Sequence, residues 1–143
     1  MKIIVINGPN LARLDIRDSS IYGDLNYGEL KSLIEGAALT HGFEADIRQS
    51  DDEATIIGWL HEAADKKIPV IINPAAFTHY SYAIRDAAEL LTSPLIEVHL
   101  SNPMSREEFR HTSVIAGVAT GTIAGFGPNS YVLAIIALKN LIG

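Results

Sequence analysis

Apolar residues along the chain fall into two alternating patterns. Short, nearly continuous apolar runs bounded by polar turns are typical of strands buried on both faces. Between them, apolar residues recur at spacings of three and four, which is typical of helices with one buried face. We predict strands over residues 2–7, 43–49, 69–74, 94–100 and 117–126.

The segments between the strands carry recognisable helix starts. Asn26 with Glu29 has the spacing of a capping box, and so does Ser50 with Glu53. Pro128 suits the first turn of a final helix. We therefore expect helices over residues 26–42, from residue 50 onward, over 81–91 and over 129–142, with a short helical turn over 105–111.

This strand–helix alternation predicts an α/β fold in which one parallel sheet is covered by helices on both faces. Right-handed crossovers leave few arrangements of five strands, and the flavodoxin-like, doubly wound order 2-1-3-4-5 is the common one. The 143 residues match the usual size of one domain, so we expect a single catalytic domain over residues 1–143.

Composition narrows the class of protein. The formal net charge of −6 and the lack of Lys/Arg clusters argue against nucleic acid or an anionic membrane as partner. No apolar run reaches the roughly 18 residues that a membrane span needs. Without cysteine, neither a disulfide framework nor thiolate chemistry is expected. The chain enters its first strand directly, without a cleavable apolar segment, so we expect a cytoplasmic protein.

Polar residues gather where the predicted strands end. Ligands of such sheets bind at the carboxyl ends of the strands, near the point where the strand order reverses. Asn7 lies at the end of the first strand, Asn73 at the end of the third and His99 at the end of the fourth. Each also has an ordinary explanation, because an Asn after a strand is more often a turn residue and a His there is as often packed as reactive.

The sequence lacks the motifs expected for a metal site or for a lysine imine mechanism. Glu97 and His99 share a strand face, but two metal ligands without a third are weak evidence for a metal site. No Lys follows a strand at this end, which disfavours an imine mechanism. Arg106 and Arg110 have the spacing of a solvated helix face. The remaining His, Tyr, Arg and Asn residues suit proton transfer.

Longer motifs then indicate a family. The motifs occur in order over nearly the whole chain: "INGPNL" after the first strand, "R…IYG" in the next loop, "INPAAFTHYS", "EVHLSN", "REEFRH" and "GFG…Y". Together they resemble the type II 3-dehydroquinate dehydratases. The resemblance implies a hydro-lyase that needs no cofactor and no metal. Its reaction would be the anti elimination of water from 3-dehydroquinate to give 3-dehydroshikimate through an enolate, in the shikimate pathway or in quinate catabolism.

The resemblance also implies the catalytic residues. Tyr22 would be the base that removes the proton next to the ketone, and Arg17 would hold it as tyrosinate, because a nearby cation favours the ionised phenol. Asn10 would hold the water that stabilises the enolate oxygen. His99 would be the acid that protonates the departing hydroxyl, oriented by Asn73. The long loop within residues 6–23 would bring Arg17 and Tyr22 over the substrate.

By the same resemblance, the substrate is a small anionic carbocycle held from two sides. Its carboxylate would bind the backbone of Leu100 and Ser101 together with Asn73. Its ring hydroxyls would bind His79 and Arg110.

Asp86 matches a residue that reaches into a neighbouring subunit's site. The family is typically a dodecamer built from trimers, and the apolar final helix agrees with a homo-oligomer.

The chain departs from the family pattern near the expected base. Asp15 stands where Gly is usual, and Asp18-Ser19 where Glu-Pro is usual. An additional carboxylate there could compete for Arg17 and weaken its effect on Tyr22. Ala75 replaces a frequent Gly in the turn after the third strand, which we expect to be a mild change.

Two other functions stay open on the sequence. One is a non-catalytic carboxylate-binding module of the same fold whose loop no longer closes, but a pure binder does not need an activated phenol. The other is a receiver-type signalling domain. That reading requires acidic residues and a phosphorylatable Asp at the ends of the first and third strands, where this chain has Asn7 and Asn73.

Overall fold

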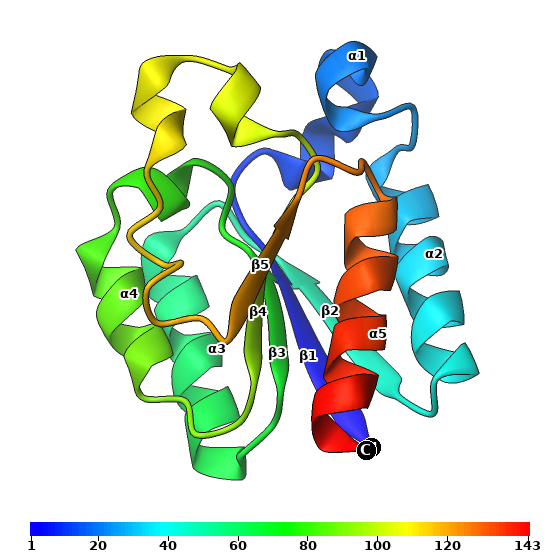
Figure 1. Ribbon diagram of the computed structural model, residues 1–143, viewed down its shortest axis with the longest axis vertical. Helices are drawn as coiled ribbons and strands as arrows, with labels where there is room; N and C mark the ends of the chain where they lie inside the picture. The colour runs from blue at the N-terminus through cyan, green and yellow to red at the C-terminus, as the bar shows by residue number, and fades with distance from the viewer.

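One sheet of five parallel strands forms the centre of the molecule (Figure 1). The computed structural model describes residues 1–143. The strand order is β2-β1-β3-β4-β5, which confirms the predicted fold class and topology. The strands are β1 (Lys2–Asn7), β2 (Glu44–Gln49), β3 (Val70–Asn73), β4 (Leu95–His99) and β5 (Gly121–Ala124).

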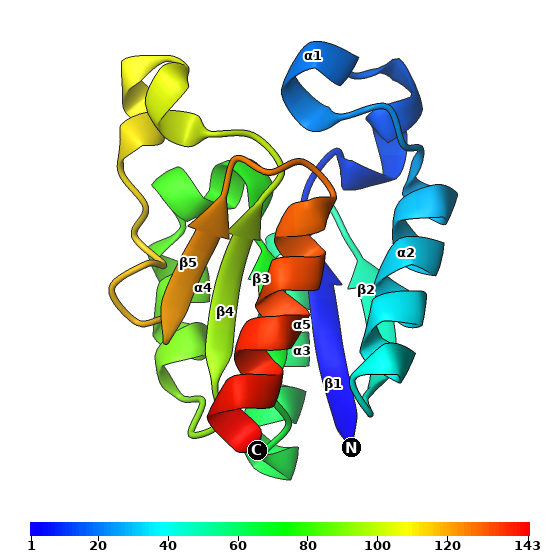
Figure 2. The same cartoon turned by 45° about the vertical axis from the view of Figure 1, so that its right-hand side comes forward.

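Helices cover both faces of this sheet (Figure 2). One face packs against α2 (Tyr27–Thr40) and α5 (Asn129–Ile142), and the other against α3 (Glu53–Lys66) and α4 (Tyr82–Glu89). Burial of apolar side chains on the two faces supplies most of the driving force for this arrangement. None of the helices has the length and apolar character needed to cross a bilayer.

The short elements all lie above the carboxyl ends of the strands, at the top of Figure 2. The chain after β1 forms a 3₁₀ turn (Leu11–Ile16) and the short helix α1 (Ser19–Tyr22), and the chain after β4 forms two further 3₁₀ turns (Pro103–Ser105 and Glu108–His111). A fourth 3₁₀ turn (Ala75–His79) follows β3. Residues far apart in the sequence are thereby brought to one end of the sheet.

Some predicted boundaries were wrong for local reasons. The fifth strand begins at Gly121 rather than at residue 117, because the amides of Val118 and Ala119 donate to the Ile115 carbonyl and close a turn first. The cap of α3 is Asp52, which accepts from the Thr55 amide, whereas the Ser50 hydroxyl accepts from the Asp52 amide.

The structure confirms other features expected from the sequence. The predicted capping box at the start of α2 is present, with reciprocal bonds between Asn26 and Glu29. Gly42 follows the end of that helix with a φ of +81°, a conformation that favours glycine. Pro128 occupies the N-cap of α5, next to its expected place in the first turn.

Two features fix the backbone at the site end of the sheet. Asn7 and Asn73 are register partners at the ends of β1 and β3, and Gly8 follows so closely that an added Cβ would lie 2.7 Å from the Pro74 carbonyl oxygen. Leu11 and Leu14 are buried in the core, so the first part of the loop after β1 is anchored rather than free.

Candidate active site

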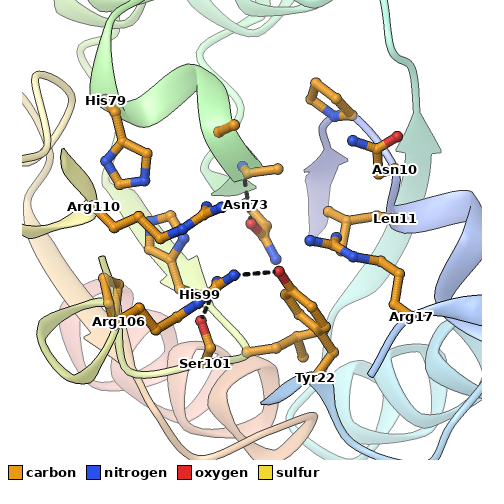
Figure 3. A pocket seen from close by; sticks show the side chains of 15 residues that line it. Asn10, Leu11, Arg17, Tyr22, Asn73, His79, His99, Ser101, Arg106 and Arg110 are labelled. Carbon is orange, nitrogen blue, oxygen red and sulfur yellow. Dashed lines mark hydrogen bonds between the residues drawn. The ribbon is translucent and has the colours of Figure 1, made fainter. Parts of the chain in front are cut away.

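A cavity of about 120 Å³ opens at the carboxyl ends of β1, β3 and β4, where such sheets bind ligands (Figure 3). Figure 3 shows His79 and Arg110 on one side, with Asn10 and Arg17 on the other. The residues that line the cavity come from five segments of the chain: Pro9, Asn10, Leu11, Arg17, Tyr22, Asn73, Ala75, Ala76, His79, His99, Leu100, Ser101, Pro103, Arg106 and Arg110.

The structure brings together nine of the ten site residues expected from the sequence; these are Asn10, Arg17, Tyr22, Asn73, His79, His99, Leu100, Ser101 and Arg110. The tenth, Asp86, lies on α4 outside the cavity. Its exposed carboxylate pairs with Arg85 at 3.4 Å. A role for Asp86 in a neighbouring subunit stays a prediction.

Tyr22 lies between two guanidinium groups. The Arg17 guanidinium carbon is 3.5 Å from the centre of the Tyr22 ring, a stacked cation–π contact. Arg106 instead contacts the hydroxyl group, to which its Nη2 donates a hydrogen bond at 2.6 Å. A second bond, from Arg106 Nη1 to the Ser101 hydroxyl at 3.1 Å, fixes this orientation.

Arg106 is the functional residue that sequence reasoning missed. Its spacing from Arg110 suggests a solvated helix face, but both residues line the cavity. The signal was the placement of both residues shortly after β4, the strand that carries His99. Neither the helical spacing nor the neighbouring glutamates could reveal a partner 84 residues away in the sequence.

The cavity is locally cationic although the chain is acidic overall. Partial burial lowers the pKa of the Arg17 guanidinium from its ordinary value, opposed by Tyr22, and the charges of Arg106 and Arg110 lower it further. Three guanidinium groups around one small cavity create a field that attracts an anion despite the net charge of −6.

His99 is held by a buried carboxylate on the same strand. Its Nε2 lies 2.6 Å from Glu97 Oε2, and the Glu97 side chain is completely buried. Thr78 and Ser113 hydroxyls also donate to this carboxylate, at 2.5 and 3.0 Å. Since an ionised carboxylate only accepts, Nε2 carries the proton and Nδ1 is left for a ligand.

The charge of Glu97 depends on these donors. Burial alone would raise the pKa of the Glu97 carboxyl, but the hydrogen bond and charge of His99, with the bonds from Thr78 and Ser113, outweigh it. The net result is a lowered pKa, and Glu97 is ionised at neutral pH. The pair considered from sequence as metal ligands is thus joined by a direct hydrogen bond.

Asn73 does not orient His99, which corrects the expectation from the sequence. The Asn73 Oδ1 accepts from the Ala75 amide at 3.1 Å, and Nδ2 donates to the Tyr131 hydroxyl at 2.9 Å. The histidine instead has its carboxylate partner two residues earlier on β4. Glu97 serves this purpose because residues i and i+2 of a strand share a face.

His79 and Arg110 are also oriented by neighbours. His79 Nδ1 lies 2.8 Å from the Thr112 carbonyl, which only accepts, so this nitrogen carries the proton and Nε2 is free. Arg110 Nε donates to Glu107 at 2.9 Å, and its guanidinium lies over the Phe109 ring. Both side chains can therefore present a polar atom to a ligand.

Asn10 adopts a left-handed backbone conformation, with φ of 69°, which asparagine tolerates better than most residues. Its amide donates to Asp51 at 2.9 Å, so the backbone is tied to the loop after β2. The side chain has no hydrogen bond within the protein and borders the cavity.

The unusual carboxylates near Arg17 have other partners. Asp15 pairs with Arg13 at 3.2 Å, and Asp18 caps α1 by accepting from the Ser20 amide at 3.0 Å. Neither is among the charges that act on Arg17. The structure shows no ion pair between either carboxylate and Arg17, because the loop turns both side chains toward local donors.

Comparison with known proteins agrees with this geometry. Residues 1–139 match the family model for dehydroquinase class II. A curated 3-dehydroquinate dehydratase from Mycobacteroides abscessus is 53% identical over 135 residues, or 94% of each chain.

Solved structures also resemble this chain over nearly its whole length. The crystal structure of type II dehydroquinase from Propionibacterium acnes superposes with a TM-score of 0.95 at 47% identity, covering 97% of this chain and 96% of that one. The corresponding enzyme from Butyrivibrio crossotus gives 0.94 at 46% identity, covering 97% of each chain. With its order of strands and the cavity at their carboxyl ends, this chain belongs to the class II dehydroquinase family.

Proposed function

We propose that this chain dehydrates 3-dehydroquinate to 3-dehydroshikimate as a hydro-lyase, with residues 1–143 acting as one catalytic domain. The observation that carries the proposal is one cavity in which a tyrosine contacts two guanidinium groups and a histidine is paired with a buried carboxylate. Family membership supports the same reaction, because the curated relatives are named 3-dehydroquinate dehydratase.

In the first step, the Tyr22 phenolate removes the proton next to the ketone, and the electron pair moves to the ketone oxygen as an enolate. Arg17 on the ring face and Arg106 at the hydroxyl are placed to stabilise the negative charge of this phenolate. A water held by Asn10 donates to the enolate oxygen. The enzyme thereby stabilises charge where it develops.

In the second step, the enolate re-forms the ketone and a carbon–carbon double bond, and the C–O bond of the adjacent carbon breaks. For this step His99 carries a second proton on Nδ1, while its Nε2–H stays hydrogen-bonded to Glu97. The Nδ1 proton passes to the departing hydroxyl, so water leaves. Glu97 orients the imidazole for this transfer by holding Nε2. Tyr22 then returns its proton to solvent and His99 takes one up, which completes the cycle without any cofactor.

Substrate binding uses the rest of the cavity. We assign the carboxylate to the Leu100 and Ser101 backbone with the Asn73 amide, and the ring hydroxyls to His79 and Arg110. The surplus of cationic groups and the directed donors favour a small anionic polyol over an apolar ligand.

We further propose that the chain works as a homo-oligomer, a dodecamer built from trimers, in which Asp86 enters a neighbouring site. The exposed position of Asp86 supports this, as do exposed aromatic side chains at Tyr82 and Phe109. A cytoplasmic location agrees with a small anionic metabolite as substrate. The same reaction serves biosynthesis through shikimate and breakdown of quinate.

The direct test is an ultraviolet assay with purified protein and 3-dehydroquinate, in the presence of a chelator. Formation of the conjugated enone product supports the proposal, and loss of the signal in Tyr22→Phe assigns it to this cavity. If the wild-type protein binds 3-dehydroquinate without forming the enone, the chain is instead a carboxylate-binding module of the same fold.

A further inference from the structure

A chain of three buried polar side chains lies behind the cavity wall. The Tyr131 hydroxyl, on the first turn of α5, donates to Asn7 Oδ1 at 2.6 Å, and Asn73 Nδ2 donates to the Tyr131 oxygen at 2.9 Å. Each of the three residues is at most 2% exposed. Only Asn73 lines the cavity, so Tyr131 and Asn7 cannot touch a ligand there.

The direction of these hydrogen bonds is fixed at both ends. A backbone amide only donates, so the atom of Asn73 that faces the Ala75 amide at 3.1 Å is its oxygen. At the other end, the Tyr131 hydroxyl gives its one proton to Asn7 and can only accept from Asn73. The two neighbours therefore select the same orientation of the Asn73 amide.

This orientation decides what Asn73 offers to a ligand. Of its two N–H groups, one is used by Tyr131, and the second remains as a donor. An amide rotated by 180° would place its oxygen there instead and would repel a carboxylate. Burial raises the pKa of the Tyr131 hydroxyl above its ordinary value, so the group stays neutral and keeps this pattern over the working pH range.

We propose that Tyr131 is a positioning residue that fixes the Asn73 amide with one N–H free for the substrate carboxylate. The inference rests on the proposed function, because that function assigns the carboxylate to Asn73. It adds Tyr131 and Asn7, two buried residues that never contact substrate, to the determinants of specificity for an anion.

The test compares Tyr131→Phe with the control Tyr27→Phe. Phenylalanine keeps the packing of the ring but removes the acceptor for Asn73 and the donor for Asn7. Tyr27 is a suitable control, because its hydroxyl meets Asn7 at 3.5 Å and has no bond to Asn73. We expect the KM of Tyr131→Phe for 3-dehydroquinate to rise roughly 10-fold, the scale of one hydrogen bond to a charged group. Its kcat should stay within about 2-fold, because the reacting groups are untouched.

A pair of inhibitors separates positioning from general damage. Quinate carries the carboxylate, whereas its methyl ester has the same ring without the charge. In Tyr131→Phe, inhibition by quinate should weaken by roughly the same factor as KM, and inhibition by the ester should change little. Equal weakening of both inhibitors would mean that the cavity has merely lost its shape, and would overturn the proposal.

The remaining outcomes are also decisive. If the wild-type enzyme is active and Tyr131→Phe leaves both KM and quinate inhibition unchanged, the positioning role is wrong while the proposed function stands. A wild-type protein without activity on 3-dehydroquinate fails the proposed function itself. Should Tyr131→Phe not fold, Asn7→Leu removes the acceptor that orients the Tyr131 hydroxyl and must show the same preference against quinate.

Discussion

The Nη2 atom of Arg106 lies 2.6 Å from the hydroxyl oxygen of Tyr22 and donates a hydrogen bond to it. Arg17 meets the same residue on its ring face, 3.5 Å from the ring centre. Arg106 lies farther from the ring centre, at 5.0 Å, but it donates a short hydrogen bond to the hydroxyl oxygen. A charged hydrogen bond at the oxygen acts where the negative charge of a phenolate is concentrated, so Arg106 should have the larger influence.

The different contacts of Arg106 and Arg17 with Tyr22 predict the effect of removing each cation. Arg106→Met should move the acidic limb of the kcat/KM profile to higher pH by more than Arg17→Met does. Its loss of rate at neutral pH should be roughly 10- to 100-fold, the scale of a hydrogen bond to a charged group. Arg106→Lys should recover only part of the rate, because an ammonium cannot bond Tyr22 and Ser101 in the same planar geometry. If the acidic limb of the kcat/KM profile stays at the same pH in both Met variants and only KM changes, these cations only hold the substrate.

Replacing His99 should abolish most turnover without preventing binding. We expect kcat of His99→Ala to fall roughly 10²- to 10⁴-fold, the usual contribution of general acid–base catalysis. Binding of 3-dehydroquinate, measured by calorimetry, should persist because the carboxylate is held elsewhere. Near-normal turnover in this variant would remove His99 from the mechanism.

The lowered pKa of the Glu97 carboxyl predicts how stability depends on pH. A carboxyl with a lower pKa in the folded state contributes stability above its unfolded pKa of about 4.3, and this contribution is lost as pH falls through the folded value. The unfolding free energy of Glu97→Gln should therefore fall less steeply below that pH than in the wild type. Urea unfolding between pH 3 and 6 measures this pH dependence of the unfolding free energy, with Glu44→Gln as an exposed control. Identical slopes for wild type and Glu97→Gln would show that folding does not lower the pKa of the Glu97 carboxyl.

Asp15 should have little influence on catalysis, in contrast to the expectation from the sequence alone. Its carboxylate is exposed and paired with Arg13. Asp15→Asn removes the charge and keeps the backbone, and its kcat/KM at neutral pH should stay within about 2-fold of wild type, since exposed pairs contribute little. A clear acceleration would restore the idea that this carboxylate competes for Arg17.

Ala75 has a φ of 52°, a left-handed conformation that favours glycine. A residue with a Cβ adopts it at a cost of about 1–2 kcal/mol, and glycine loses about 0.5–1 kcal/mol in chain entropy. Ala75→Gly should therefore raise the unfolding free energy by roughly 0.5–1 kcal/mol. The matched control is Ala76→Gly, at a neighbour without positive φ, which should be destabilised. Destabilisation of both variants would mean that Ala75 is not strained.

The fold was accessible from the sequence because its signals are local. Apolar runs and helical spacing identified five strands and four longer helices, and the rule for crossovers then gave the strand order. The errors occurred where two local choices compete. The N-cap of α3 is Asp52 rather than Ser50. The turn closed on the Ile115 carbonyl makes the last strand begin later than predicted.

The site was less accessible, because its contacts join distant segments. Motifs identified Tyr22 and His99, but nothing in the helical spacing of Arg106 shows that its partner lies on α1. The partner of His99 was assigned to Asn73 although Glu97 was nearer on the same strand face. Hydrogen-bond partners of this kind follow from side-chain direction in three dimensions, which periodicity does not encode.

The buried Leu14 and the capping box at Asn26 have a consequence for the loop between them. They fix both ends of the segment that carries Arg17 and Tyr22. Arg17 and Tyr22 therefore belong to one short segment that is anchored on both sides, and their stacked contact is formed within it. The contact between these two side chains thus depends on local chain geometry, whereas the bond from Arg106 to Tyr22 depends on how distant segments pack.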